Sequence, residues 1–380
     1  MMTPLRYLFL VLGILIGLHY ILSFTHEEYG RATSISNIAS GLRGSQPPYK
    51  YEAKPVSDYF DGNTTVHRKA NAAFVVLARN NDLQNVIASM KQMEDRFNKK
   101  FDYPWVFLNE QPFSEDFIKR TTEVTASKTS YGLIPKEHWV QPEWIDEPKA
   151  AKARQKMLEN KVIYGGSVPY RNMCRFNSGF FFKHELLKDV KYYWRVEPSV
   201  KFFCDIDYDP FLVMQDGNKV YGFTISLYEY ESTIPTLWET TKEFIKENPQ
   251  YLAEGNAMKF ISDNGGEKYN RCHFWSNFEI GDLDFWRGEA YTKYFEHLDK
   301  IGGFYYERWG DAPVHSIGAA LFAKKEQIHF FDDIGYRHEP FQHCPQGAAH
   351  SKGKCWCDPA DNFGMSISTT SPSFLLKIVP

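Results

Sequence analysis

Residues 71–110 read NAAFVVLARNNDLQNVIASMKQMEDRFNKKFDYPWVFLNE, and this stretch decides the fold class. It opens on a continuous apolar run, residues 71–78, which predicts a strand buried on both faces. Apolar side chains then recur every three or four positions over residues 83–97, which predicts an amphipathic helix with Asp82 as its N-cap. A second apolar strand is expected over residues 103–108. This strand, helix and strand order predicts a βαβ unit, and hence a parallel pair of strands with a right-handed crossover.

Ligands of such a sheet bind beyond the carboxyl ends of its strands. Arg79 and Asn109 stand at the two ends predicted here. The chain has neither a G-x-G-x-x-G nor a G-x-x-x-x-G-K string, so nothing indicates a dinucleotide or P-loop fold. Further elements are expected later in the chain: strands over residues 192–197 and 220–226, helices over residues 236–247 and 288–298, and a helix cap at Asp282 and Asp284.

The N-terminal segment predicts the compartment. Residues 7–24 (YLFLVLGILIGLHYILSF) form an apolar run of membrane-spanning length, with positive charge before it and acidic residues after it. This pattern predicts a type II signal-anchor with a cytoplasmic tail at residues 1–6; a cleaved signal peptide is the alternative. A polar stretch rich in Ser, Gly and Pro predicts a lumenal stem over residues 25–68, followed by a catalytic domain over residues 69–380.

A lumenal body would meet oxidising conditions and the glycosylation machinery. The six cysteines are therefore expected to form disulfides, in pairings that the sequence leaves open, and their spacing does not indicate zinc. Asn63 begins the sequon Asn-Thr-Thr and is a predicted glycosylation site. The net charge of −3 gives no indication of nucleic-acid binding.

One segment holds two competing candidates for a divalent cation site. Asp205 and Asp207 have the D-x-D spacing of hard oxygen ligands, which suit Mn²⁺ or Mg²⁺. Glu197 ends a predicted strand just before a proline, and a carboxylate there is costly unless it pairs or binds a cation. The residues alone leave the choice between them open.

Two later segments carry isolated polar residues. Glu279 lies between apolar neighbours, so it is either structural or a cleft carboxylate with a task. Asp311 precedes His315, and His338 and His343 follow further on. A single histidine is more often structural than a ligand, and three near one acidic residue weaken that expectation. No G-x-S-x-G string supports a serine hydrolase.

Five long strings in collinear order resemble the fungal α-1,2-mannosyltransferases of glycosyltransferase family 15. They are YGGSVPYRNMCRFNSGFF (164–181), YWRVEPSVKFFCDIDYDPF (193–211), CHFWSNFEIGDLDFW (272–286), YYERWGDAPVHSIG (305–318) and YRHEPFQHCP (336–345). The resemblance implies a GT-A-like nucleotide-sugar transferase, an α/β domain with a mixed central sheet, preceded by one transmembrane helix and a stem.

The resemblance also assigns the metal site. The glutamate of R-V-E-P, Glu197, and the histidine of Y-R-H, His338, would hold Mn²⁺ against the GDP phosphates, which leaves Asp205 and Asp207 as runners-up. Arg195 would lie near the diphosphate, where a cation stabilises the leaving group.

The glutamate of S-N-F-E, Glu279, matches the proposed nucleophile of the family. Retention at the anomeric carbon needs either two inversions with a carboxylate nucleophile or same-face attack with charge stabilisation, and Glu279 would serve either. Tyr170 and Asp311 match residues of the sugar-binding cleft, and Arg79 is assigned to nucleotide-sugar or acceptor binding from its place at the strand end.

The expected activity is retaining α-1,2-mannosyl transfer from GDP-mannose to a mannose-terminated O-linked or N-linked glycan of glycoproteins. The expected location is the Golgi membrane, or the endoplasmic reticulum, with the catalytic domain in the lumen. A catalytically silent glycan-binding member of the same fold is the alternative; its sequence would be free to lose Glu197, Glu279 and His338, all of which are present.

Overall fold

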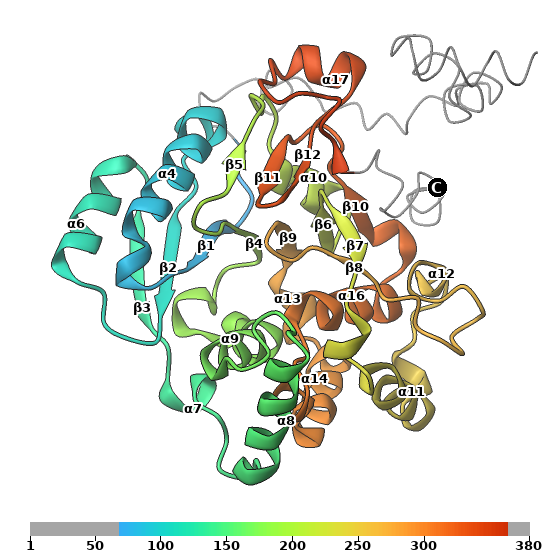
Figure 1. Ribbon diagram of the computed structural model, residues 1–380. Coiled ribbons are helices and arrows are strands. Elements are labelled where there is room, and N and C mark those ends of the chain that lie inside the picture. The colour runs from blue at the N-terminus through green and yellow to red at the C-terminus, as the bar shows by residue number, and fades with distance from the viewer. Residues whose placement is uncertain (1–67, 364–380) are drawn as a thin grey trace, which may run out of the picture. The chain divides into compact units, whose positions relative to one another are not determined.

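The computed structural model describes residues 68–363 (Figure 1). The predicted span at residues 7–24, the sequon at Asn63 and nearly all of the predicted stem lie outside the described residues. In the described part of the chain, no helix is long and apolar enough to cross a membrane.

A mixed sheet organises the described residues. Its seven strands run in the order β10–β6–β9–β4–β1–β2–β3. Their bounds are β1 Ala72–Leu77, β2 Trp105–Asn109, β3 Thr129–Leu133, β4 Tyr192–Arg195, β6 Tyr221–Phe223, β9 Glu279–Asp282 and β10 Ile328–Phe330. Strand β1 pairs in parallel with β2 and β4, whereas β9 is antiparallel to β4 and β6. The predicted βαβ unit and the mixed sheet are both confirmed.

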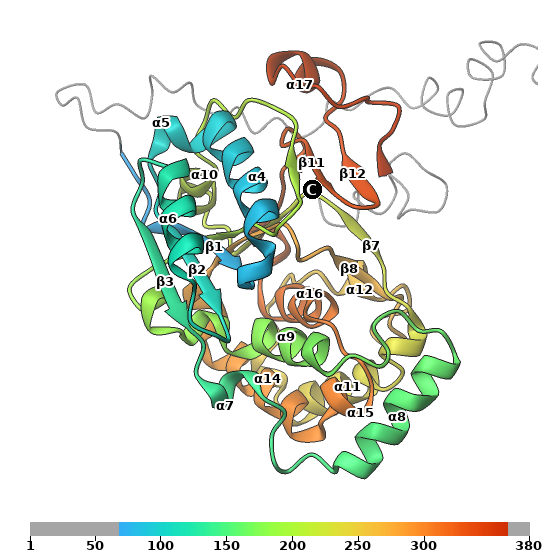
Figure 2. The same ribbon diagram turned by 60° about the vertical axis from the view of Figure 1, so that its left-hand side comes forward.

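Helices cover both faces of this sheet, and Figure 2 shows α4 and α6 on one side of β1 and β2 with α9, α14 and α16 on the other. The helices are α4 Leu83–Met93, α5 Lys99–Phe101, α6 Glu115–Val124, α7 Lys136–Trp139, α8 Glu147–Glu159, α9 Val168–Gly179, α10 Pro210–Asp216, α11 Leu237–Glu247, α12 Met258–Ile261, α13 Leu283–Arg287, α14 Glu289–Ile301, α15 Gly303–Tyr306, α16 Asp311–Phe322 and α17 Gly347–Lys352. Alternate residues of β1 enter opposite cores: Ala73 and Val75 pack on one face, Phe74 and Val76 on the other. Burial on both faces explains why β1 is apolar without a break.

The predicted elements and the observed ones differ in three respects. The helix expected over residues 83–97 continues past α4 as a π-helical turn, Glu94–Asn98. Asp82 does not cap α4: its carboxylate accepts from the backbone N–H of Arg79 and closes a short 3₁₀ turn instead. The strand expected over residues 220–226 is two strands, β6 and β7 (Ser226–Tyr228). Asp282 caps α13 as expected, since its side chain accepts from the backbone N–H of Asp284.

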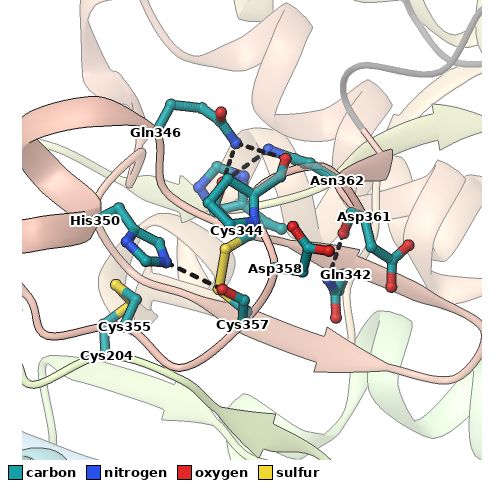
Figure 3. The surroundings of a disulfide bond; sticks show 12 residues. Cys204, Gln342, Cys344, Gln346, His350, Cys355, Cys357, Asp358, Asp361 and Asn362 are labelled. Carbon is teal, nitrogen blue, oxygen red and sulfur yellow. Dashed lines mark hydrogen bonds between the residues drawn. A yellow bond between two sulfur atoms is a disulfide. The ribbon is translucent and has the colours of Figure 1, made fainter. Parts of the chain in front are cut away.

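A small second sheet carries the C-terminal part of the fold. Strand β11 (Tyr336–His338) lies between β5 (Lys201–Phe202) and β12 (Phe341–His343), and both pairings are antiparallel. Two disulfides join residues 355–357 to the two strands that flank β11 (Figure 3). Cys355 is bonded to Cys204, which follows β5, and Cys357 is bonded to Cys344, which follows β12. We call residues 355–357 the staple. The staple therefore links the two strands that pair with β11 covalently.

Four of the six cysteines therefore form the expected disulfides. The other two, Cys174 and Cys272, are free and buried. His350 lies beside the sulfurs of Cys344 and Cys357, but its Nε2 atom contacts the Cys357 carbonyl oxygen at 3.0 Å (Figure 3). Because the disulfide leaves neither sulfur as a thiolate, this cluster does not provide a zinc site.

Candidate active site

Two of the predicted site residues face each other across neighbouring strands. Arg195, the last residue of β4, is the register partner of Glu279, the first residue of β9. Side chains opposite one another in an antiparallel pair lie on the same face of the sheet. The strand pairing alone therefore brings the R-V-E-P and S-N-F-E strings together.

Arg195 is the centre of an acidic cluster. Its guanidinium donates to Oδ2 of Asp311 at 2.6 Å and to Oε1 of Glu197 at 2.5 Å, and it lies 3.9 Å from Oε1 of Glu279. Burial alone would lower the pKa of Arg195, but the charges of these three carboxylates raise it well above its ordinary value. One buried guanidinium thus faces three carboxylates, so these four side chains together carry a net negative charge.

Glu197 and His338 form the outer edge of this cluster. The Nε2 atom of His338 lies 3.4 Å from Oε2 of Glu197, and its Nδ1 atom lies 2.9 Å from the carbonyl oxygen of Glu339. Burial opposes ionisation of Glu197, but the Arg195 charge and the hydrogen bonds from His338 and Arg195 lower its pKa to about 2. Burial opposes protonation of His338 as well, and the hydrogen bond and charge of Glu197 raise its pKa above the ordinary value.

This geometry suits a metal-binding imidazole. A carbonyl oxygen accepts only, so Nδ1 of His338 carries a proton and Nε2 is left with the lone pair when the ring is neutral. In the protonated ring Nε2 donates to Oε2 of Glu197, 3.4 Å away, and once that proton leaves, the Nε2 lone pair is available to a cation. A nitrogen and an oxygen donor beside spare negative charge are a donor set that Mn²⁺ accepts.

Glu279 is almost completely enclosed, with 1% of its surface exposed. Its Oε1 atom accepts from the hydroxyl of Tyr193 at 2.9 Å, and its Oε2 atom accepts from the hydroxyl of Tyr221 at 3.0 Å. The Nδ1 atom of His315 lies 3.0 Å from the same Oε2. Burial and the charge of Glu279 raise the pKa of both phenols well above the ordinary value, so both remain donors.

A glycine makes room for these phenols. Gly281 is the register partner of Tyr193 on one side and of Tyr221 on the other. A Cβ at Gly281 would lie 2.6 Å from the Tyr193 ring and 3.0 Å from Nε1 of Trp286. Any side chain at this position would therefore push Tyr193 away from Glu279.

Asp311 joins the cluster from the first turn of α16. Its Oδ2 atom accepts from Arg195 and also from the hydroxyl of Ser276 at 2.9 Å. A carboxylate in the first turn of a helix is stabilised by the helix dipole. These contacts hold the Asp311 carboxylate in place beside Arg195.

Tyr170 lies in the first turn of α9, where Ser167 caps the helix. Its ring stacks on Tyr164 with centroids 4.4 Å apart, and the Arg308 guanidinium lies 5.2 Å from its centroid. Burial raises the pKa of Tyr170 well above its ordinary value, and the charge of Asp311 adds to the rise. An aromatic ring flanked by charged groups is a common wall of a sugar site.

A small cavity opens where this cluster meets the ends of β1, β2 and β4. Its lining is mostly apolar, with Arg195, Glu279 and Asn177 as its polar members. The lining residues are Val75, Leu77, Leu108, Phe176, Asn177, Phe181, Tyr193, Arg195 and Glu279. The cavity therefore lies at the carboxyl ends of the parallel strands, where the sequence places the ligand crevice.

The remaining candidates from the sequence form ion pairs with residues outside the Arg195 cluster. Arg79 is largely exposed and pairs with Asp82 at 3.1 Å. Asp205 pairs with Arg96 at 2.6 Å, and Asp207 pairs with Lys100. Both aspartates of the D-x-D pair are thus engaged in ion pairs with basic side chains.

Sequence reasoning missed Tyr193, Tyr221 and His315 as partners of Glu279. The sequence marks His315 only as one of several histidines that follow Asp311. The signal that could have found them is positional, because Tyr193 is two residues before Arg195 on one strand face and His315 is four residues after Asp311 on one helix face.

The comparisons with known proteins decide the family. The family model described as glycolipid 2-alpha-mannosyltransferase, glycosyltransferase family 15, matches residues 32–375. The chain belongs to this family. It is therefore a mannosyltransferase, and the expected mannosyl transfer and the expected α/β fold with a mixed central sheet are confirmed.

Individual members of glycosyltransferase family 15 agree. Glycolipid 2-alpha-mannosyltransferase 1 of Candida albicans is 57% identical over 87% of this chain and 77% of its own length. Core-mannan synthase A of Aspergillus fumigatus, crystallised in a Mn/GDP form, is 48% identical, covers 83% of this chain with 84% of its own, and has a TM-score of 0.75. The mannosyltransferase Ktr4p of S. cerevisiae in complex with GDP is 38% identical, with 88% and 87% coverage and a TM-score of 0.80. These likenesses identify the fold as GT-A-like with a mixed sheet.

Proposed function

We propose that this member of family 15 is a retaining α-1,2-mannosyltransferase that moves mannose from GDP-mannose to a mannose-terminated O-linked or N-linked glycan. The observation that carries the proposal is the Arg195 cluster, in which a metal-type pair, Glu197 with His338, stands beside the enclosed carboxylate of Glu279. The relatives' Mn/GDP and GDP complexes support the choice of donor and cation.

Glu197 and His338 are the residues proposed to hold the cation. When bound there, Mn²⁺ would supply positive charge to the diphosphate that leaves with GDP. Arg195 keeps Glu197 ionised and oriented, since it donates directly to that carboxylate. The chain's own contribution at this edge is therefore a preorganised anion and an imidazole of fixed tautomer.

Glu279 is proposed to act on the sugar side. Its carboxylate is held by Tyr193 and Tyr221 next to the cavity, so a positively charged anomeric centre there would meet a fixed negative charge. This placement serves a covalent route and a same-face route alike. Tyr170 and Asp311 are proposed to line the sugar-binding cleft, and Arg79 to contact the nucleotide sugar.

We propose, from the apolar run and its flanking charges, that residues 7–24 anchor the enzyme as a single-pass type II protein of the Golgi membrane or endoplasmic reticulum. Residues 25–68 would then be a lumenal stem, with a glycan on Asn63. Protease treatment of sealed microsomes tests this orientation. A C-terminal tag should be protected until detergent is added, and digestion of the tag in intact vesicles would refute the orientation.

The activity is tested with the full-length protein in detergent, GDP-mannose, Mn²⁺ and methyl α-mannoside. The expected product is a disaccharide whose α-1,2 linkage is assigned by NMR. Extending the acceptor to O-linked and N-linked mannose chains then selects the substrate class. If folded protein transfers mannose to none of these acceptors, the proposal is wrong.

Two substitutions separate the proposed roles. Glu197→Gln should lose metal-dependent GDP binding, whereas Glu279→Gln should retain that binding and lose turnover. If both variants keep wild-type turnover, the residue assignment fails even where the activity itself is present.

A further inference from the structure

His315 is a buried histidine that lies between two acceptors. It has no exposed surface, and it lies on α16 one turn after Asp311. Its Nε2 atom is 3.0 Å from the carbonyl oxygen of Asn177, and its Nδ1 atom is 3.0 Å from Oε2 of Glu279. A carbonyl oxygen only accepts, so Nε2 carries a proton.

The protonation of Nδ1 follows from the other partners of Glu279. Nε1 of Trp286 donates to the Tyr193 hydroxyl at 3.0 Å, so the hydroxyl proton of Tyr193 is directed at Oε1 of Glu279. The Tyr221 hydroxyl donates to Oε2, and the Arg195 guanidinium lies 3.9 Å from Oε1. Two hydroxyl donors and a nearby cation favour the ionised carboxylate.

An ionised Glu279 offers only acceptors to His315. Nδ1 must then carry a proton as well, which makes the ring an imidazolium. The indole of Trp286 stacks on this ring with centroids 4.5 Å apart and planes at 24°, an arrangement that favours a cationic ring. Charge, hydrogen bonding and stacking thus all favour a protonated His315 ring.

We propose that His315 is a positioning residue for mannosyl transfer: as an imidazolium held by Asn177, it fixes Oε2 of Glu279 and so orients the carboxylate, whose Oε1 meets Tyr193 and Arg195. The inference rests on the proposed role of Glu279 in the mannosyltransferase reaction. His315 has no place at the metal pair, since in the described part of the chain its polar contacts are to Glu279 and Asn177.

The first test measures the protonation state without any turnover. The full-length protein in detergent is labelled with ¹⁵N-histidine, and the His315 signals are identified by their absence from His315→Gln. Both ring nitrogens of His315 should have the chemical shifts of protonated nitrogens, and Glu279→Gln should convert the ring to a neutral tautomer. A neutral His315 ring in the wild-type protein would overturn the proposal.

His184 is the matched internal control. It is also buried, but its Nδ1 accepts from the backbone N–H of Leu186 while its Nε2 lies 3.2 Å from the Leu133 carbonyl oxygen. A ring with one donor and one acceptor partner is neutral. Its spectrum should therefore show one protonated nitrogen in the wild type and in Glu279→Gln.

The second test uses kinetics. His315→Gln should lower kcat on the order of 10²-fold, the scale of a misplaced catalytic group, with GDP affinity in the presence of Mn²⁺ changed less than about twofold. His184→Gln should leave kcat within about twofold of wild type. A His315→Gln variant with the kcat of His184→Gln would overturn the positioning role. If the wild type transferred no mannose, the proposed function would fail, while the NMR test would still decide the ion pair.

Discussion

The Nε2 atom of His338 lies 3.4 Å from Oε2 of Glu197, and the two residues come from different parts of the fold. Glu197 follows β4 of the large sheet, and His338 ends β11 of the small one. The proposed metal pair therefore exists only while the small sheet keeps its place beside the large sheet. The metal pair can therefore be tested through metal affinity and through the stability of the fold.

Metal affinity should depend on pH through His338. A proton and Mn²⁺ compete for the same Nε2 lone pair, and the pKa of His338 is raised, so the competition begins at a higher pH than for an ordinary imidazole. Below that pKa, Mn²⁺ affinity should fall toward about tenfold per pH unit, because one proton must leave for each ion bound. Mn²⁺ titration followed by EPR at pH 8, 7 and 6 measures the effect.

The control for this pH dependence is the histidine on the neighbouring strand. Burial lowers the pKa of His343 to about 4, so this ring is neutral throughout the range measured. His343→Gln should keep the pH dependence of Mn²⁺ affinity. An affinity that stays constant from pH 8 to 6 in the wild type would remove His338 from the metal site.

The D-x-D pair should be dispensable for metal binding. Asp207 pairs with Lys100 and is half exposed, so Asp207→Asn should change the free energy of unfolding by no more than about 1 kcal/mol and leave Mn²⁺ affinity unchanged. Glu197→Gln, measured beside it by calorimetry, should lose that affinity. Equal losses in the two variants would return the D-x-D pair to consideration.

A buried ion pair away from the site offers a stability prediction. Arg175 donates two hydrogen bonds to Asp299, at 2.7 and 2.8 Å, and both side chains are largely buried. Asp299→Asn should lower the free energy of unfolding by about 3 kcal/mol, because the guanidinium would keep its charge without a counter-ion. The exposed pair of Lys293 and Glu296 is the control: Glu296→Gln should cost under about 1 kcal/mol in the same urea titration.

The two disulfides of the staple should differ in their contributions. Cys204–Cys355 closes a sequence separation of 151 residues, and Cys344–Cys357 closes one of 13. Replacing the first pair by serine should cost about 5 kcal/mol and replacing the second about 3 kcal/mol, if loop entropy in the unfolded chain dominates. Urea unfolding of the two double variants decides, and a larger loss for the short loop would show that local packing matters more.

How far the sequence predicts this molecule depends on the range of the interactions concerned. Strand β1 and helix α4 follow from local periodicity, and the pairing of β1 with β2 follows from the short crossover between them. The predicted N-cap at Asp82 is wrong because its carboxylate accepts from the backbone N–H of Arg79 and not from the first turn of α4. Residue types alone do not tell which of two nearby backbone N–H groups a carboxylate will accept from.

The candidate site shows the same limit at longer range. The five strings suffice to name Glu197, Glu279 and His338, but motif reading cannot say which side chains surround them. The enclosure of Glu279 depends on Tyr221 and on His315, which reach it from other elements. The D-x-D alternative meets the same limit, since the lysine that pairs with Asp207 lies far away in the chain.

The staple has a consequence for biosynthesis. Synthesis adds Arg195, Glu197 and Glu279 first, His338 later, and the cysteines of residues 355–357 after all of these. A nascent chain that stops short of residue 355 thus holds nearly every residue proposed to bind the donor, yet its β11 has unfastened neighbours. We therefore expect His338 to be held firmly beside Glu197 only after residue 357 has been added and both thiol pairs have been oxidised.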